Sequence, residues 1–427
     1  MVFRPDVEGA PRTGSTHGGL RCSQTTRTAD MGHRTRERRG DTAVDALAEG
    51  MRTIGVEEEL LLVDGTTGAP VPIADLVLDR ARTDRLPLDG AEFAGEMQLE
   101  MLEVITRPHS TLATLGRQVL DNRALAARLA AEHGALAAPL ASSPLPTVPH
   151  LRSSDRYERM VQRFGAVPRH SLTCGLHVHV AVESDHEGVA VLDRIRTWLP
   201  ILIALTANSP FHAGEDTGHA SFRSVTWNQW PTAGPAERYE TVAGYRGLTA
   251  AINGTGALLD PAMLYFDARL SRNHPTVEVR VTDVPLDPTM TVAVAGLVRA
   301  LVDTAVAEWH AGKPPAATPA CIIRLANWRA AIEGLDGHLI EPLTNRPLPA
   351  HEVVLMLLEH LRPALTANGD DQLVEHAVHQ AFVSGNGATR QRAVHATSGD
   401  LGQVAVRAAR AQPTTSTLPE TAVRTPR

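Results

Sequence analysis

Four segments of the sequence place charged side chains inside stretches whose composition is otherwise that of buried β-strands. They cover residues 53–63, 100–106, 171–182 and 276–282. Each is rich in β-branched or alternating apolar residues, a pattern that predicts a strand. The segments lie too far apart in sequence for tight hairpins and do not alternate regularly with helices. The pattern therefore favours an α+β fold over a doubly wound parallel sheet.

Apolar residues spaced three to four positions apart predict the helices. The expected helices cover residues 112–133, 188–206, 289–311, 351–361 and 371–383. Residues 207–260 show weak periodicity and are rich in Gly, Pro, Asn, Thr and Trp. Because a long irregular segment inside a compact domain is usually functional, we expect this one to serve a site.

The two ends of the chain differ in composition from the part between them. Residues 1–50 are rich in Arg, Thr and Gly and lack apolar periodicity, which is typical of a disordered extension. Met51 directly precedes the first predicted strand, so we expect the functional protein to begin near it. We predict one catalytic domain over 51–405, with a helical part over 289–405, and a flexible tail over 406–427.

Composition narrows the possible classes of function. With 41 basic against 48 acidic residues the formal net charge is −7, which argues against bulk binding of nucleic acid. Lys313 is the single lysine, so the chain has neither a GxxxxGK[ST] phosphate loop nor a lysine suited to Schiff-base chemistry. Any phosphate must therefore be held by arginines, backbone amides or a metal ion.

Cysteine usage and hydropathy indicate the compartment. Cys22, Cys174 and Cys321 lie far apart, with no CxxC pair, which is typical of a reducing environment. The sequence shows no run of 18 apolar residues and no apolar centre of a signal peptide near its start. We therefore expect a cytoplasmic protein that is not embedded in a membrane.

The first candidate site motif is GVEEEL at 55–60. Because side chains alternate along a strand, Glu57 and Glu59 point to one face while Glu58 points to the other. Two carboxylates side by side repel each other unless a cation lies between them. The pair alone predicts either a metal site or an exposed acidic edge. Ligands that are all oxygen favour Mg²⁺ or Mn²⁺ over zinc.

The second and third motifs add acids and imidazoles. Glu96, Glu100 and Glu103 lie within an apolar stretch, where helical spacing would place them on one face. A solvated helical stripe is the alternative to a site, and a strand would place the three differently. In CGLHVHV, His177 and His179 share one face of a predicted strand. Such a pair favours a site, with metal ligation and phosphate contact both open.

Two motifs with arginines complete the set. In VEVRV, Glu278 and Arg280 share a strand face, as a plain ion pair or as a metal ligand beside an anion-binding fork. In the irregular segment, glycines and small polar residues surround Arg223, as expected of a loop that closes over an anionic ligand. In a chain without a phosphate-loop lysine, Arg223 is the candidate for binding phosphate.

In their order along the chain, the motifs resemble those of the glutamine synthetase superfamily. Within it the sequence looks most like the type 2 glutamate–cysteine ligase family, also called carboxylate–amine ligases. The resemblance spans about 51–405 and rests on TIGVEEELLLVD (53–64), EVITRP (103–108), CGLHVHV (174–180), NSPF (208–211), GEDTGHASFRS (214–224), WPTAGP (230–235), VEVRVTDVPLDP (277–288), NWRAAIEGLDGHLI (327–340) and GNGATRQR (385–392). The combination is far more specific than any one of these motifs.

The resemblance implies a fold and a reaction. The fold is a mainly antiparallel, curved sheet that forms an active-site funnel, with helices packed outside it. The reaction is the ATP-dependent joining of glutamate to an amine such as cysteine, through a γ-glutamyl phosphate, with Mg²⁺ or Mn²⁺ as the metal. Residues 212–224 would close over the intermediate. A homo-oligomer is also expected.

The resemblance further implies roles for individual residues. The implied metal ligands are Glu57, Glu59, Glu96, Glu103, His177 and Glu278. His179 would lie beside the nucleotide phosphates, Arg223 would bind the transferring phosphate, and Arg280 would stabilise charge on the phosphoryl group. Thr276 stands where glutamine synthetases have an arginine, and we expect Arg269 or Arg272 to replace it. Glu100 has no clear counterpart.

Three alternatives remain at this point. The same fold could ligate another amino acid, an amine or a protein side chain. A non-enzymatic binding protein with a decayed site is disfavoured, because all the principal carboxylates and arginines are present. An HxH strand also marks metal-dependent amidohydrolases, but those carry the motif early in the chain and use a bridging lysine.

Overall fold

The computed structural model describes residues 50–83 and 92–411. Nearly all of the predicted N-terminal extension and most of the predicted tail lie outside this described part. The expectation that the functional protein begins near Met51 stays a prediction. Within it, helices and strands alternate irregularly along the chain, as the α+β prediction requires.

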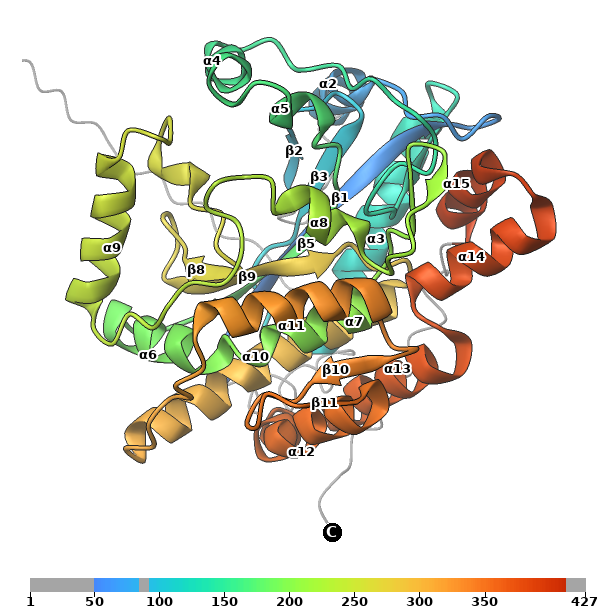
Figure 1. Cartoon of the computed structure of the whole chain (residues 1–427). Helices are drawn as coiled ribbons and strands as arrows, with labels where there is room; N and C mark the ends of the chain where they lie inside the picture. The colour runs from blue at the N-terminus through green and yellow to red at the C-terminus, as the bar shows by residue number, and fades with distance from the viewer. Residues whose placement is uncertain (1–49, 84–91, 412–427) are drawn as a thin grey trace, which may run out of the picture. The chain divides into compact units, whose positions relative to one another are not determined.

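A seven-stranded sheet organises the described part of the chain (Figure 1). Its strands are β1 (Ile54–Asp64), β2 (Glu92–Gly95), β3 (Met101–Ile105), β4 (Ala135–Ala138), β5 (Gly175–Ala181), β8 (Ala268–Leu270) and β9 (Thr276–Asp283). The order is β2-β3-β1-β5-β9-β8, and β4 also pairs with β1. Every pairing among these strands is antiparallel, which confirms the predicted kind of sheet.

The register of the ladders brings the sequence motifs together. Glu57 lies opposite His177, and Glu59 lies opposite Glu103. Glu278 lies opposite His179. Because strand side chains have a period of two, these pairs share one face of the sheet although they come from four separate parts of the sequence.

Helices cover the sheet and surround its ends. They are α2 (Ala74–Thr83), α3 (Leu112–Ala131), α4 (Asp155–Phe164), α5 (Val167–His170), α6 (Asp185–Ile195), α7 (Leu199–Thr206), α8 (Phe222–Trp227), α9 (Val242–Gly254), α10 (Pro288–His310), α11 (Ala320–Glu333), α12 (Ala350–Asn368), α13 (Asp371–Ser384), α14 (Gly387–Ser398) and α15 (Leu401–Arg410). The central helix α10 packs against α3, α6, α12, α13 and strand β5. Its side chains therefore form the middle of the largest apolar core. Two short hairpins, β6 (Phe211–His212) with β7 (Glu215–Asp216) and β10 (His338–Ile340) with β11 (Pro347–Pro349), lie off the sheet.

The face of β1 that turns away from the charged motifs is held by a buried ion pair. Arg123 of α3 donates to both carboxylate oxygens of Glu58, at 3.0 and 2.6 Å. The hydroxyl of Thr291 in α10 donates to the same carboxylate at 2.7 Å. Glu58 thus ties strand β1 to two helices, while its neighbours in sequence point to the opposite face.

Several predicted boundaries differ from the structure. The predicted helix 188–206 is two helices, α6 and α7, because Pro200 in the first turn of α7 lacks an N–H for a continuous ladder. Residues 207–260 contain α8 and α9, which weak periodicity concealed. The predicted tail begins too early at 406, because α15 continues to Arg410 with buried Ala408 and Ala409.

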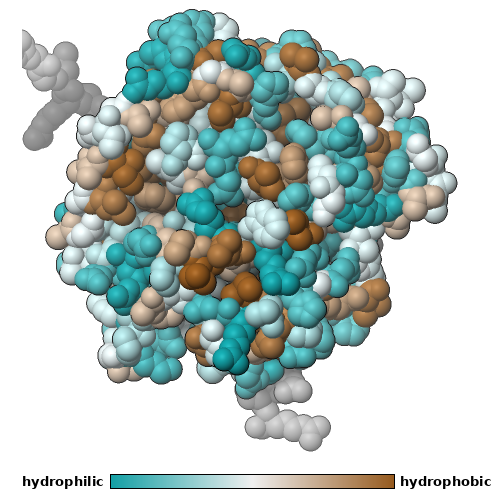
Figure 2. All heavy atoms as spheres, in the orientation of Figure 1, coloured by the Kyte–Doolittle hydropathy of each residue, from teal (hydrophilic) through white to brown (hydrophobic). Residues whose placement is uncertain are grey.

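One described helix, α10, is long and apolar enough to cross a membrane. However, 83% of its apolar window is buried inside the protein, as expected for the central helix of a core. Exposed large apolar side chains are few, and two of them, Leu325 and Trp328, lie on α11. The face in Figure 2 accordingly mixes polar and apolar residues, with apolar ones gathered over α11 near its centre.

Candidate active site

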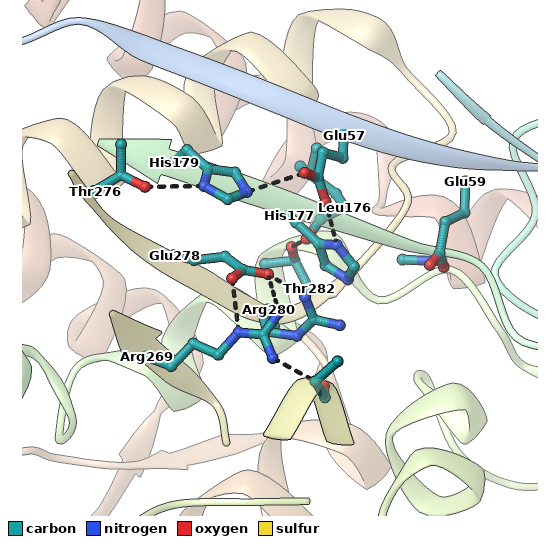
Figure 3. A network of polar contacts seen from close by, with 12 residues as sticks. Glu57, Glu59, Leu176, His177, His179, Arg269, Thr276, Glu278, Arg280 and Thr282 are labelled. Carbon is teal, nitrogen blue, oxygen red and sulfur yellow. Dashed lines mark hydrogen bonds and ion pairs between the residues drawn. The ribbon is translucent and has the colours of Figure 1, made fainter. Parts of the chain in front are cut away.

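The charged face of the sheet opens into a cavity of about 510 Å³. Side chains from four neighbouring strands and from the segment after β2 line it, and they bring together eight residues predicted from the sequence: Glu57, Glu59, Glu96, Glu103, His177, His179, Glu278 and Arg280. Figure 3 shows most of this group on the strands. The structure therefore assembles in one place residues that are more than 200 positions apart.

Glu57 lies between the two histidines. Its carboxylate is 2.9 Å from Nδ1 of His177 and 3.1 Å from Nε2 of His179 (Figure 3). Burial by itself raises the pKa of Glu57, but the hydrogen bonds to the two imidazoles outweigh burial and hold its pKa well below the usual range. The other ring nitrogen of His179 shares a hydrogen bond of 3.0 Å with the hydroxyl of Thr276. Glu57 is thus an anion fixed between two ring nitrogens.

Glu278 is held by two arginines. Arg269 donates Nε and Nη2 to the two carboxylate oxygens at 2.7 and 3.2 Å, and Arg280 donates Nη1 to one of them. Although burial raises the pKa of Glu278, the two guanidinium groups lower it far below the usual range. Arg269 was one of two arginines expected to replace the one missing at Thr276, and Arg272 also lines the cavity. Arg269 is the one that contacts the site carboxylate.

A second acidic group lies at the β2–β3 end of the cavity. Glu59, Glu96 and Glu103 present carboxylate oxygens within 4.8 Å of one another. Burial, followed by repulsion from Glu59, raises the pKa of Glu96 to about 7. Burial and the neighbouring carboxylates also raise the pKa of Glu103. Like charges held this closely are costly without a counterion, so this group is suited to a cation.

The donor set fits divalent metal ions. Among the described residues, three groups have ligand atoms within 4.8 Å of one another: Glu57, Glu103 and His177; Glu57, His179 and Glu278; Glu59, Glu96 and Glu103. All six predicted metal ligands belong to these groups, together with His179. Ligands rich in carboxylate oxygen suit Mg²⁺ or Mn²⁺. The shared ligands Glu57 and Glu103 would place neighbouring ions close together.

Arg223 occupies a different place from the one predicted. It is buried, it does not line the cavity, and its guanidinium donates to the backbone carbonyls of Arg280 and Val281, each at 3.4 Å. Phosphate binding by Arg223 therefore stays a prediction without support from this geometry. Its guanidinium also lies 5.7 Å from the ring of Trp227, which does line the cavity.

The segment expected to close over the site is anchored elsewhere. None of residues 211–224, all of them described, lines the cavity. Instead Arg392 of α14 binds Asp216 with two hydrogen bonds of 2.8 and 2.7 Å, and the Ser221 N–H donates to the Ala331 carbonyl at 2.8 Å. Because the segment is fixed to α11 and α14, the prediction of a loop that closes over the site from 212–224 gains no support.

Glu100, which was left out of the predicted ligands, lies apart from the cavity. It lies in the turn between β2 and β3, is buried, and accepts hydrogen bonds from the backbone N–H of His150 at 3.0 and 3.1 Å. Its carboxylate is also 2.7 Å from the His150 ring, and it does not line the cavity. Spacing alone could not separate Glu100 from Glu96 and Glu103, because a helix would align all three.

Sequence reasoning missed an aromatic wall of the cavity. This wall is formed by Tyr157 of α4, Trp227 of α8, Trp230 and Tyr265. The Tyr265 ring packs against both tryptophans, Trp230 also contacts Phe164, and Tyr157 packs against the same apolar cluster. Arg156, paired with Asp260 at 2.9 Å, lies beside it. Burial raises the pKa of both Tyr157 and Tyr265. Of these four residues only Trp230 belongs to a motif of the family resemblance, WPTAGP, and that motif implied no role for it.

Comparison with solved structures shows the same fold. A glutamate–cysteine ligase from Francisella tularensis, in complex with AMP, matches with a TM-score of 0.57 at 14% identity, over 84% of this chain and 88% of that one. A bifunctional glutathione synthetase from Pasteurella multocida matches with a TM-score of 0.62 at 15% identity, over 86% of this chain and 53% of that one. These similarities confirm the predicted fold class.

Sequence comparison is more specific. A Streptomyces avermitilis protein named "Putative glutamate--cysteine ligase 2-1" is 47% identical over 351 residues, which cover 82% of this chain and 96% of that protein. A Streptomyces coelicolor protein named "Putative glutamate--cysteine ligase 2" is 47% identical over 354 residues, or 83% and 97%. The sequence model of glutamate–cysteine ligase family 2 (GCS2) matches residues 53–409. The chain therefore belongs to glutamate–cysteine ligase family 2 and is a carboxylate–amine ligase, an enzyme that forms C–N bonds.

Proposed function

We propose that this enzyme joins the γ-carboxylate of glutamate to the amine of cysteine at the expense of ATP, and so forms γ-glutamylcysteine. The observation that carries the proposal is the single cavity in which three groups of potential metal ligands meet the Glu278–Arg269–Arg280 pairings. The relatives named for glutamate–cysteine ligation support the choice of glutamate and cysteine.

The proposed reaction has two steps, because a carboxylate cannot expel oxide when an amine attacks it. In the first step a γ-carboxylate oxygen attacks the γ-phosphorus of ATP, ADP leaves, and γ-glutamyl phosphate forms. In the second step the amine attacks the acyl carbon, inorganic phosphate leaves, and the nitrogen loses a proton. Cleavage of one phosphoanhydride bond of ATP thus drives the formation of one amide bond, and atoms and charge balance over the two steps.

The carboxylates and imidazoles of the three groups would hold Mg²⁺ or Mn²⁺. Such ions neutralise phosphate charge and align the phosphoryl group for in-line transfer. Before binding, Glu57 is already an anion fixed by His177 and His179, so little reorganisation is needed at this ligand. When a cation binds, Glu96 and Glu103 would release their protons to the solvent and ligate it as carboxylates, since their pKa values are raised without a cation.

Arg280 is the side chain that would stabilise the negative charge that develops on the phosphoryl oxygens. Glu278 fixes its guanidinium, and the Arg280 N–H is held by the Asp267 carbonyl at 2.9 Å. The guanidinium lines the cavity and is buried, so little water competes for its hydrogen bonds. Preorganised donors of this kind are worth roughly 10²-fold or more in rate.

The alternative reactions have less support. Lys313, the single lysine, is largely exposed and pairs with Glu308 at 3.2 Å, so it does not serve the cavity as a bridging lysine would. The cytoplasmic location and the homo-oligomer stay predictions. A different amine remains the natural second candidate for the same cavity, and the test below includes it.

The experiment is an ADP-release assay with Mg–ATP, glutamate and a panel of amines that includes cysteine. We expect ADP release that requires both glutamate and cysteine, together with γ-glutamylcysteine identified by mass spectrometry. ADP release with a different amine, and not with cysteine, would support the ligase activity but assign a different amine substrate. Nucleotide binding with no amine-dependent release for any member of the panel would reject the proposal.

A further inference from the structure

Four motif segments of the sequence have no part in the cavity lining, yet hydrogen bonds link them around one buried residue, three of them directly and the fourth through Asn208. The motifs are NSPF (208–211), GEDTGHASFRS (214–224), the end of VEVRVTD (277–283) and GNGATRQR (385–392). The residue is Asp283, the last of strand β9, which is 1% exposed. It lies three positions beyond Arg280 on the strand that supplies Glu278.

Asp283 accepts hydrogen bonds from three residues of the segment that follows α7. One carboxylate oxygen accepts from the Asn208 N–H at 2.9 Å and from the Ser209 hydroxyl at 2.8 Å. The other accepts from the Ser221 hydroxyl at 2.8 Å. A buried carboxylate with this many donors fixes the backbone around them, because a buried donor left unpaired is costly.

The same segment is fixed from the opposite side by α14. Gln391 donates to the backbone and side-chain oxygens of Asn208 at 2.8 and 2.7 Å. A Cβ at Gly387 would collide with the Asn208 amide, so only glycine allows α14 to approach this closely. Asn208 in turn donates to the Val284 carbonyl at 2.8 Å, directly after Asp283.

What this network holds is helix α8. The Ser209 hydroxyl accepts the Arg223 N–H at 2.9 Å, and Ser221 is the N-cap of the helix. Beyond this fixed end, Arg223 of α8 donates to the backbone carbonyls of Arg280 and Val281. Trp227, at the other end of the helix, lies in the aromatic wall of the cavity. The helix has only six residues, so its position depends on the contacts at its start.

The buried guanidinium of Arg223 also interacts with two buried carboxyl groups. Arg223 is 2% exposed. Burial raises the pKa of both Asp283 and Asp267, and the charge of Arg223 opposes that rise.

We propose that Asp283 is a positioning residue for catalysis, which holds helix α8 so that Arg223 supports the Arg280 backbone and Trp227 completes the cavity wall. It touches no substrate itself. The catalytic part of this inference rests on the proposed function. Its structural part, the link from Asp283 through Ser209 and Ser221 to α8, rests on the contacts above.

The test compares Asp283→Asn and Ser221→Ala with Asp370→Asn in the full chain. Asp370 is a matched control, because it is also a buried aspartate, paired with Arg299 at 2.5 Å, but it lies in the helical layer outside the cavity lining. We expect kcat to fall at least tenfold in Asp283→Asn and less in Ser221→Ala, with Mn²⁺ affinity within twofold of wild type. Misplacement of groups by about 1 Å is enough for such losses. Asp370→Asn should lower stability and leave kcat within twofold.

Two further readouts separate positioning from a general loss of structure. Amide hydrogen exchange should increase at 222–228 in Asp283→Asn, while β5 and β9 keep their protection. The double variant Asp283→Asn/Ser221→Ala should lose little more activity than Asp283→Asn, because both act through one network. If Asp283→Asn does not fold, Ser221→Ala carries the same comparison.

The outcomes distinguish this inference from the proposed function. A wild-type protein with no amine-dependent ADP release would reject the function itself. An active wild type with kcat within twofold of it in both Asp283→Asn and Ser221→Ala would overturn the positioning role. The role would equally fail if Asp283→Asn lost Mn²⁺ binding in proportion to kcat, since the damage would then lie in the metal ligands.

Discussion

Glu57 is the residue that joins the two imidazoles of the cavity. It belongs to two of the three potential metal groups and contacts both histidines. We expect Glu57→Gln to lower kcat by at least 10²-fold, because the amide brings no charge to the cation. The measurement is steady-state ADP release, with circular dichroism to verify folding.

Glu100 supplies a matched control for the acids. Glu103→Gln should reduce turnover strongly, whereas Glu100→Gln should retain most of it, since Glu100 binds His150 outside the cavity lining.

Arg280→Ala should abolish turnover while the fold persists. Substantial activity in Glu57→Gln or Arg280→Ala would contradict the assignment of this cavity as the active site.

Cation affinity should depend on pH through Glu96 and Glu103. The pKa of Glu96 is raised to about 7 and that of Glu103 is raised as well, so both carry protons at lower pH in the metal-free protein. A cation must displace these protons, and affinity for Mn²⁺ should therefore rise between pH 6 and pH 8 and fall in the reverse direction. Titration calorimetry in buffers of different ionisation enthalpy would measure both the affinity and the released protons. In Glu96→Gln the slope should become shallower, and an unchanged slope would contradict the assignment.

The face of the sheet on which a side chain lies could be predicted where the alternation along a strand determines it. Alternation along a strand placed Glu57 and Glu59 on one face and Glu58 on the other, and the structure agrees. It could not decide between a helix and a strand for the stretch in which Glu96 follows β2 and Glu103 lies on β3, because that depends on the pairing of β3 with β1. The place of Arg223 was also hidden, since an arginine in a polar loop looks the same whether it meets a ligand or backbone carbonyls.

Strand β1, as an element, presents the site on one face and its anchor on the other. Glu58→Gln should lower the free energy of unfolding by about 3–5 kcal/mol, because Arg123 would lose its buried counter-charge. Below its melting temperature the variant should keep near-normal kcat, since Glu58 does not line the cavity. Urea unfolding and ADP release on the same samples would measure the two effects. A large loss of kcat with little loss of stability would be the contrary result.

Long, strongly patterned elements were predictable and short ones were not. The expected strands at 53–63 and 276–282 and the helix at 289–311 agree with β1, β9 and α10 to within one residue or so. The three-residue strand β8, which carries Arg269, exists because β9 is available as its partner. Helix α9 begins at an N-cap, Thr241, whose signal was weaker than the glycines around it.

At the scale of the whole molecule, Glu96 and Glu103 oppose folding when they are ionised, because burial and the neighbouring carboxylates raise their pKa values and a cation would offset both effects. Mg²⁺ or Mn²⁺ should therefore raise the melting temperature by several degrees, and a chelator should reverse the change. A ligand at 100 times its Kd stabilises by about 2.7 kcal/mol. Differential scanning fluorimetry would measure the shift, with Glu59→Gln as a variant in which it should shrink and Glu100→Gln as one in which it should persist. Equal shifts in all three proteins would place the cation elsewhere.

The aromatic wall is the part of the site that only the whole molecule determines. Its rings come from α4, from α8 with the turn after it, and from the segment before β8. The two tryptophans meet Tyr265 because the chain after α8 runs beside the segment before β8. No local pattern in the sequence marks such a meeting, so this wall could not be predicted from the sequence.

The three consecutive glutamates of β1 also bear on how the sheet assembles. A slip of one residue would turn Glu57 and Glu59 toward the helices, where Arg123 offers a single counter-charge, and would send Glu58 into the cavity. The one charge left uncompensated against an apolar layer would make that misaligned sheet several kcal/mol less stable. The acids that suit a metal ion thus also favour the native register of strand β1. Their replacement by neutral residues would weaken this preference for the native register and would also remove the chemistry.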